Sequence, residues 1–113
     1  MAERIRLSRA KGARLPATAR NVARPTKWGN PFTIASCIEN GFAETKEDAQ
    51  RLCAEVFRSW LNGNTTWHYR DGEERRQSIL ADVHTLRGYD LACWCGPGPC
   101  HADELLRRAN ADA

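Results

Sequence analysis

The stretch that decides the fold runs from Tyr89 to Asn110 and reads YDLACWCGPGPCHADELLRRAN. It holds three of the five cysteines in this chain of 113 residues and one of the three histidines. Its apolar part, 90–95, predicts a short strand, the loop 96–99 is rich in Gly and Pro, and a helix is expected to open at Cys100-His101. In α/β proteins, ligands bind where a strand ends in a loop that leads into a helix. The sequence therefore predicts a functional site in this stretch.

The last helix of the chain is the best-marked element. Asp103 and Glu104 lie in its first turn and Arg107 and Arg108 in its last turn, and both placements complement the helix dipole. Its buried side is expected to consist of Ala102, Leu105, Leu106 and Ala109.

Two further helices and two strands are predicted before this stretch. Thr45 caps a helix whose apolar residues recur at helical spacing until Gly63, with Cys53 inside the apolar face as a core thiol. A second helix is expected over 73–86. At the other end of the chain, alternation of charged and apolar residues over 4–9 predicts a strand, and 19–23 predicts another that can pair with it as a hairpin.

These elements predict one α/β domain, residues 1–113, with a three- or four-stranded sheet and about three helices. An apolar content of 42% and a charged content of 27% are ordinary for a globular protein. The chain has no apolar run of membrane-spanning length and no signal-peptide pattern, so we expect a cytoplasmic protein. In that reducing setting, clustered cysteines indicate metal binding, catalysis or burial in the core more than disulfides.

Charge is unevenly distributed along the chain. Residues 1–30 hold eight Lys and Arg with Glu3 as their one acid, whereas residues 31–113 hold nine Lys and Arg against thirteen Asp and Glu. A basic first quarter favours an anionic partner, such as a nucleotide or nucleic acid, and equally suits a solvated basic surface.

The segment 26–32, TKWGNPF, can continue neither a helix nor a central strand, because Gly29, Asn30 and Pro31 interrupt both. In a structural interpretation, Trp28 and Phe32 anchor the turn in the core. In a functional interpretation, Lys27 and Asn30 contact a ligand together with Arg24, and Trp28 stacks on a base. His68, in the connection 62–72, is a weaker candidate for a ligand or an acid–base group.

Three interpretations of the Cys/His stretch stay open. In the first, Cys93, Cys95, Cys100 and His101 bind Zn²⁺ as a Cys₃His set. The set has the right ligand types, but Cys93 and Cys95 would lie about 6–7 Å apart on an extended strand, whereas sulfurs that share a zinc ion lie within about 4 Å of each other.

In the second interpretation no metal is present. Cys95 or Cys100 is a nucleophile with His101 as the acid–base group, near a helix N-terminus that lowers the pKa of a thiol and attracts a phosphate. In the third, the cysteines fill the core as small apolar residues.

Three motifs, RPTKWGNPF (24–32), DLACWC (90–95) and PCHAD (99–103), resemble those of a domain-of-unknown-function family of short bacteriophage and bacterial proteins. The resemblance extends from about Arg20 to Asn110. It implies a small Rossmann-like α/β domain in which nucleotide or nucleic-acid chemistry is suspected, with no established reaction. The end of the chain also resembles, more weakly, a second uncharacterised α/β family with a similar Cys…Cys-His ending.

The sequence thus favours a protein that binds a nucleotide or nucleic-acid phosphate in a Cys/His-lined cleft, with processing of that ligand left open. Arg24, Lys27 and Asn30 would hold the phosphate, Trp28 would stack, and Cys95, Cys100 and His101 would act on the ligand. The alternative is a non-catalytic, zinc-stabilised module that binds nucleic acid or a host protein. The cleft requires the two motif regions to meet in space.

Overall fold

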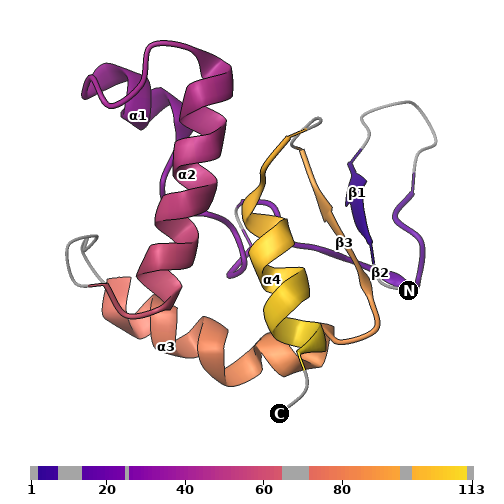
Figure 1. Cartoon of the computed structure of the whole chain (residues 1–113). Helices are drawn as coiled ribbons and strands as arrows, with labels where there is room; N and C mark the ends of the chain where they lie inside the picture. The colour runs from indigo at the N-terminus through magenta and orange to yellow at the C-terminus, as the bar shows by residue number, and fades with distance from the viewer. Residues whose placement is uncertain (1–2, 8–13, 25, 65–71, 95–97, 112–113) are drawn as a thin grey trace.

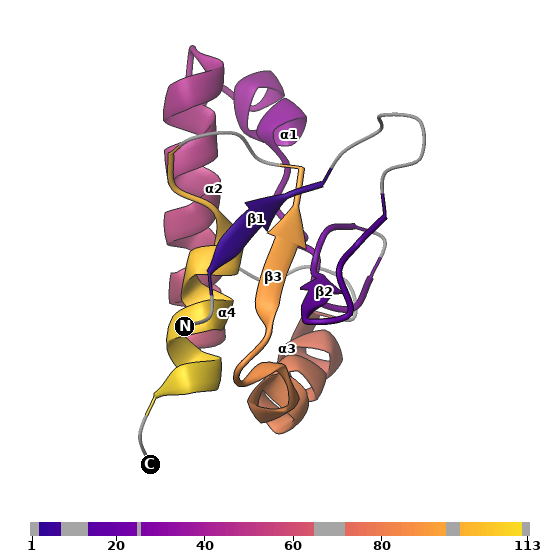
Figure 2. The ribbon, with the colours of Figure 1, turned by 90° about the vertical axis from the view of Figure 1, so that its right-hand side faces the viewer.

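The computed structural model describes residues 3–7, 14–24, 26–64, 72–94 and 98–111. Its three strands form one parallel sheet in the order β1 (Arg4–Arg6), β3 (Asp90–Cys93) and β2 (Ala19–Asn21). The last of these strands in the sequence, β3, is therefore the central strand of the sheet (Figures 1 and 2; Figure 2 shows β3 between β1 and β2).

Strand β3 is central because it is apolar on both faces. Leu91, Ala92 and Cys93 are all buried, a pattern typical of parallel strands. Its backbone is hydrogen bonded on both sides: the Leu91 amide donates to the Glu3 carbonyl at 2.9 Å, and the Ala92 carbonyl accepts from the Val22 amide at 2.9 Å. Without both edge strands, these buried polar groups would lose their partners.

The predicted hairpin of the first two strands is wrong. Both segments are strands, but β1 and β2 are not neighbours, and each pairs in parallel with β3. The local pattern of each segment indicated a strand but carried no information on its partner, and the buried strand that both segments flank, β3, comes about 70 residues after β2 and more than 80 after β1.

The helices of the described residues are α1 (Ile34–Glu39), α2 (Lys46–Leu61), α3 (Gly72–Asp82) and α4 (His101–Asn110), and a 3-10 turn, η1 (Val83–Leu86), follows α3. α2, α3 and α4 confirm the predicted helices, whereas the short helix α1 was not predicted. Thr45 caps α2 as expected, since its hydroxyl accepts from the Asp48 amide at 3.1 Å. The predicted strand 90–95 ends at Cys93.

Helix α4 lies between the sheet and α2. It packs on β3 and β1 with one side and on α2 with the other (Figures 1 and 2). The main core is shared by these layers and includes Phe57, Trp60 and Leu61 of α2 and Leu91 of β3. No helix in the described part of the chain has the length and apolar character that a membrane span requires.

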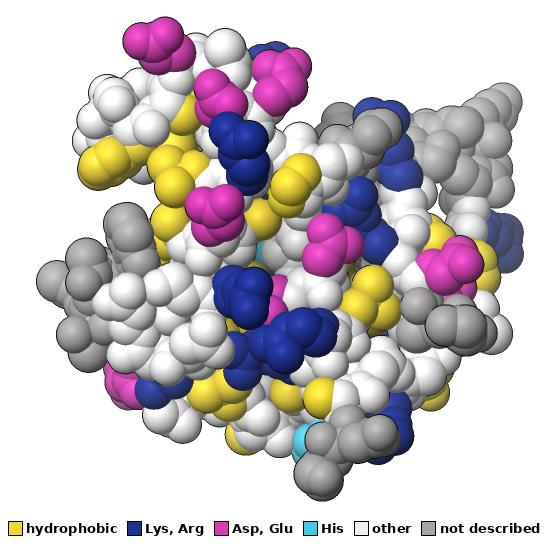
Figure 3. Space-filling view, in the orientation of Figure 1, with side chains coloured by type: hydrophobic (Ala, Val, Ile, Leu, Met, Phe, Trp, Pro, Cys, Tyr) yellow, Lys and Arg dark blue, Asp and Glu magenta, His cyan; other side chains and the backbone are white. Residues whose placement is uncertain are grey.

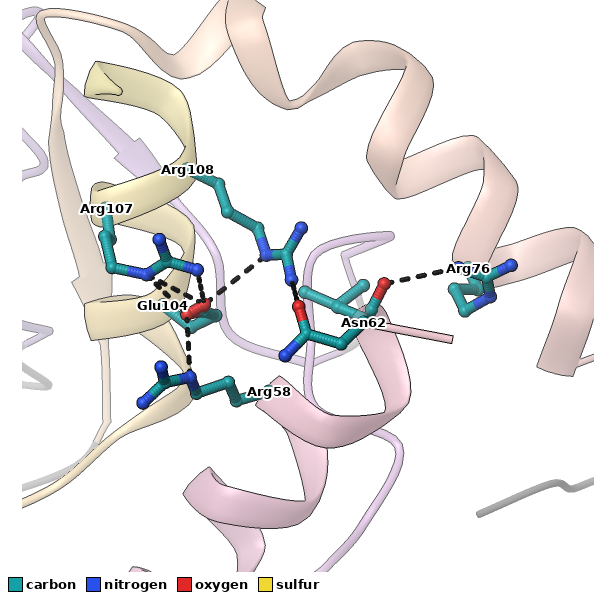
Figure 4. Close-up of polar contacts among 7 residues, drawn as sticks. Arg58, Asn62, Arg76, Glu104, Arg107 and Arg108 are labelled. Atoms are coloured by element: carbon teal, nitrogen blue, oxygen red, sulfur yellow. Dashed lines mark hydrogen bonds and ion pairs between the residues drawn. The ribbon is translucent and has the colours of Figure 1, made fainter. Parts of the chain in front are cut away.

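A carboxylate joins α2 to α4. Glu104, only 6% exposed, accepts from Arg107 at 2.8 Å and lies 3.4 Å from Arg108 and 3.8 Å from Arg58 of α2. Figure 4 shows the three guanidinium groups converging on this one carboxylate. Arg108 also donates to Asn62, at the end of α2. On the surface of this face, Lys and Arg side chains gather where α2 and α4 meet (Figure 3).

Burial raises the pKa of Glu104, but the hydrogen bonds from Arg107 and the charges of all three arginines outweigh burial, so the net shift is downward. A carboxylate whose pKa is depressed in the folded state stabilises the fold above its ordinary pKa and loses that contribution as the pH falls. The cluster therefore holds α4 against α2 at neutral pH and weakens in acid.

We expect Glu104→Gln to lower the free energy of unfolding at pH 7 by about 2 kcal/mol, because it leaves clustered guanidinium groups without their shared anion. Urea denaturation followed by circular dichroism measures this loss. The difference from the wild type should shrink as the pH falls below the ordinary pKa of a glutamate, about 4.3, because the wild-type carboxylate then also takes up a proton.

The matched control is Glu73→Gln. Glu73 also pairs with an arginine one turn away, Arg76, at 2.7 Å, but it is 68% exposed. The Glu73→Gln substitution should lower the free energy of unfolding much less, because exposed ion pairs contribute little to stability. Equal losses from the two variants would contradict a special role for the buried carboxylate.

Candidate functional site

A pocket of about 320 Å³ lies beyond the carboxyl ends of β2 and β3. It is lined by residues that follow β2, by residues of α2, and by both sides of the Cys/His stretch. These are Ala23, Arg24, Asn30, Phe32, Ile34, Gln50, Cys53, Ala54, Cys93, Trp94, Pro99, Cys100 and His101. The pocket therefore brings together the two motif regions, as the cleft interpretation requires.

His101 connects the first turn of α4 to the end of β2. Its Nε2 lies 2.8 Å from the Val22 carbonyl oxygen. A carbonyl can only accept, so Nε2 carries the proton. In the neutral imidazole, Nδ1 is then an acceptor, and it faces the Cys100 sulfur at 3.5 Å. The backbone of β2 thus selects the tautomer that presents a basic nitrogen to a thiol.

Burial lowers the pKa of His101, and the hydrogen bond to Val22 only partly offsets that effect. The side chain is 7% exposed, and Phe57 packs against its ring edge to face, with 5.3 Å between centroids. The imidazole is therefore neutral at pH 7, which agrees with an acceptor at Nδ1.

The two described thiols of the stretch are adjacent. The sulfurs of Cys93 and Cys100 are 3.2 Å apart, and the residues are 1% and 3% exposed. If the Cys100 proton points to His101, the Cys93 thiol is the donor between the two sulfurs. A line of interacting groups thus runs along the pocket wall from Cys93 through Cys100 and His101 to the Val22 carbonyl, just after β2.

The N-terminus of α4 is partly occupied by its own chain. The Cys100 amide donates to the Asp103 carboxylate at 3.0 Å, an arrangement that belongs to a capping box. Asp103 also pairs with Arg4 of β1 at 3.1 Å. The predicted attraction of a phosphate to this helix end is therefore opposed by a resident carboxylate, and the charge for an anion has to come from elsewhere in the pocket.

Arg24 supplies such a charge. It lines the pocket, and its guanidinium donates to the Asn30 carbonyl at 3.2 Å. Gly29 allows this arrangement, because a Cβ atom there would lie 2.6 Å from Arg24 Cγ and 2.9 Å from its Cα. The Gly29 carbonyl in turn accepts from Arg75 of α3 at 2.8 Å. The turn is thus folded tightly around the arginine.

Asn30 lines the pocket, but its side chain has structural partners. Its Nδ2 donates to the Cys53 carbonyl of α2 at 3.0 Å, and its Oδ1 accepts from the Phe32 amide at 2.9 Å. The predicted ligand contact by Asn30 stays a prediction, whereas its role in tying the turn to α2 follows from these bonds.

Lys27 and Trp28 are not in the described lining of the pocket. Lys27 pairs with Asp82 of α3 at 2.5 Å, and its ammonium lies 5.0 Å from the centroid of the Trp28 ring. Trp28 packs against the main core, as the structural interpretation expected. Several Lys and Arg side chains of the first 30 residues thus interact with other residues of the chain. Arg20, for example, lies 3.8 Å over the Tyr89 ring.

The zinc interpretation depends on a residue that lies outside the described part of the chain, Cys95. Within the described residues, no group of three or more His, Cys, Asp and Glu side chains is arranged to hold a metal ion. The Cys₃His site therefore stays a prediction. The proposed roles of Cys95 and His68 likewise fall outside the described residues.

The pocket residues that sequence reasoning missed include Phe32 as a lining residue, Gln50 and Trp94. Gln50 of α2 donates to the Pro99 carbonyl at 2.7 Å and so holds the loop before α4. Trp94, 43% exposed, follows directly after β3. Its aromatic character and its place beside two cysteines were visible in the sequence, but only the position of α2 shows which groups it faces across the pocket.

The fold and pocket define a small α/β protein with a thiol–imidazole pocket at the carboxyl ends of parallel strands. The chain belongs to the family described as Domain of unknown function (DUF4326), whose model matches residues 5–111. This confirms membership of a family without an assigned function. No curated protein and no solved structure matches the chain.

We expect Gly29→Ala to lower the free energy of unfolding by about 1–3 kcal/mol, the usual effect of forcing a carbon atom into a filled space. The added Cβ would meet the backbone of Arg24, which cannot move aside as a flexible side chain can. Thermal and urea denaturation measure the loss. A variant as stable as the wild type would contradict the close approach of Gly29 to Arg24.

We expect His101 to remain neutral below the pH at which a histidine ordinarily takes up a proton. Long-range ¹H–¹⁵N spectra should show the Nε2–H tautomer at pH 7 and a pKa below the ordinary histidine value of about 6.5. Because the unfolded chain protonates His101 first, this residue should reduce stability as the pH falls below about 6.5. An Nδ1–H tautomer would contradict the bond to Val22.

Proposed function

We propose that this protein binds a nucleotide, through its phosphate, in the pocket that joins the KWGNPF and Cys/His motifs. The observation that carries the proposal is the composition of the described lining: it contains Arg24 and no Asp or Glu. A pocket with one cation and no described acid favours an anionic ligand.

The volume and the location of the pocket favour a single nucleotide over a long nucleic acid as the ligand. A volume of about 320 Å³ lies at the small end of the range for ligand pockets and suits one nucleotide unit. The carboxyl ends of parallel strands are where Rossmann-like proteins bind nucleotides. On the pocket wall, Phe32 and Trp94 offer aromatic surface for a base, a role that the sequence had suggested for Trp28.

Processing of the ligand is part of the proposal. Cys100 is the described thiol with a basic nitrogen in reach, since His101 Nδ1 lies 3.5 Å from its sulfur. The imidazole would take the thiol proton, and the thiolate would attack an electrophilic carbon or phosphorus of the bound ligand. The bond from that atom to its leaving group would break, and the imidazolium would return the proton to the leaving group. The Cys93 sulfur is adjacent to the Cys100 sulfur and would position it.

The first test is a binding titration of the purified protein with a panel of nucleoside 5′-monophosphates, diphosphates and triphosphates. Calorimetry at two salt concentrations gives the affinities. We expect Arg24→Gln to weaken binding of the best ligand about tenfold or more and to reduce the salt dependence, because one ionic contact with the phosphate is lost.

Arg51→Gln is the matched control. Arg51 also lies near the pocket end of α2, but it is 61% exposed and pairs with Asp48 at 2.9 Å. It should leave the affinity unchanged. The proposal fails if no member of the panel binds the wild type and none co-purifies with it by mass spectrometry, or if both variants bind as the wild type does.

A further inference from the structure

The cysteine pair in the pocket wall has a geometry that ligand binding does not require. Cys93 ends β3 and Cys100 precedes α4, and their sulfurs lie 3.2 Å apart across seven positions of sequence. A disulfide has sulfurs about 2.05 Å apart. The two sulfurs are thus about one ångström from bonding distance.

The surrounding fold keeps the two sulfurs together. The Cys93 carbonyl accepts from the Leu7 amide at 2.8 Å, which holds the end of β3 against the first strand. On the other side, the Asp103 carboxylate holds the Cys100 amide, and the Gln50 amide holds the Pro99 carbonyl. These bonds hold both Cys93 and Cys100 in place.

Both cysteines line the pocket, although they are almost fully buried. A reagent of a few atoms can reach them through that hollow, whereas a folded protein oxidant cannot. Cys37 provides an internal comparison, since it is similarly buried, at 8%, but lies in a separate core cluster on α1.

We propose that Cys93 and Cys100 are a redox-modification site, a dithiol that hydrogen peroxide converts into an intramolecular disulfide. In the first step, one sulfur attacks a peroxide oxygen, the O–O bond breaks, and the thiol proton leaves with the released hydroxide as water. The product is a sulfenic acid.

In the second step, the other sulfur attacks the sulfenic sulfur. The S–O bond breaks, the S–S bond forms, and the second thiol proton leaves with hydroxide as a second water. Two electrons pass from the two sulfurs to the peroxide. The bond ties the end of β3 to the start of α4 and removes the Cys100 proton that faces His101, so it remodels one wall of the pocket.

The test uses the full chain without nucleotide, so its result does not depend on the proposed ligand. Reduced protein is treated with a small excess of hydrogen peroxide, alkylated, digested and mapped by mass spectrometry. We expect a cross-linked peptide pair containing Cys93 and Cys100, lighter by two hydrogens and restored by dithiothreitol. The proposal is overturned if both residues stay alkylatable or if the disulfide maps to Cys95 instead.

Two variants sharpen the result. Cys93→Ser should stop at a sulfenic acid on Cys100 that dimedone traps, because the resolving thiol is absent. Cys37→Ser should form the same disulfide at the same rate as the wild type. A Cys93→Ser protein that forms a disulfide as readily as the wild type would refute the pairing, and the wild-type peptide map decides on its own if that variant does not fold.

Discussion

The hydrogen bond from His101 to the Val22 carbonyl is the constraint on which the site depends. It joins the first turn of α4 to the residue that follows β2, at 2.8 Å, inside the core. Because the acceptor is a backbone oxygen, the bond fixes both the position of the ring and the nitrogen that carries its proton. The basic nitrogen is then directed at Cys100, and burial of the ring keeps it neutral.

The pocket exists because two turns are held open by bonds to neighbouring helices. Asn30 ties the aromatic turn to α2 through the Cys53 carbonyl, and Arg75 of α3 ties it through the Gly29 carbonyl. On the opposite side, Gln50 of α2 holds the loop before α4. Helix α2 thus positions both walls, and the Glu104 cluster fixes α2 relative to α4. Residues far from the pocket therefore control its shape.

Several of the positive charges in the described N-terminal residues pair within the chain. The basic first quarter of the chain suggested a broad anionic surface, but Arg4, Arg20 and Lys27 each contact a residue of the chain's second half. Arg24 is different, since its partner is a neutral carbonyl and it lines the pocket. Among the described N-terminal cations, Arg24 is thus the one that the fold places in the pocket with a thiol and an imidazole.

The sequence was sufficient to predict α2 and α4, because caps, helical spacing and end charges are local signals that act within one or two turns. It was also sufficient for β3, whose continuous apolar run marks a buried strand. It missed α1, a short helix with little apolar periodicity, and it could not pair β1 and β2, because alternation reveals a face and not a neighbour.

The amino-acid sequence by itself determined where the chemically capable residues lie: one Cys/His stretch after the last strand and one Lys-Trp-Gly-Asn turn near the start. Only the tertiary structure decided which of them meet. One pocket is lined by Arg24, Cys93, Cys100 and His101. In contrast, Lys27 pairs with Asp82 of α3, and Trp28 packs against the main core. The reason is physical: these contacts join residues far apart in the sequence, 79 positions in the case of His101 and Val22, and such pairings are set by the packing of whole helices and strands, which no local pattern encodes.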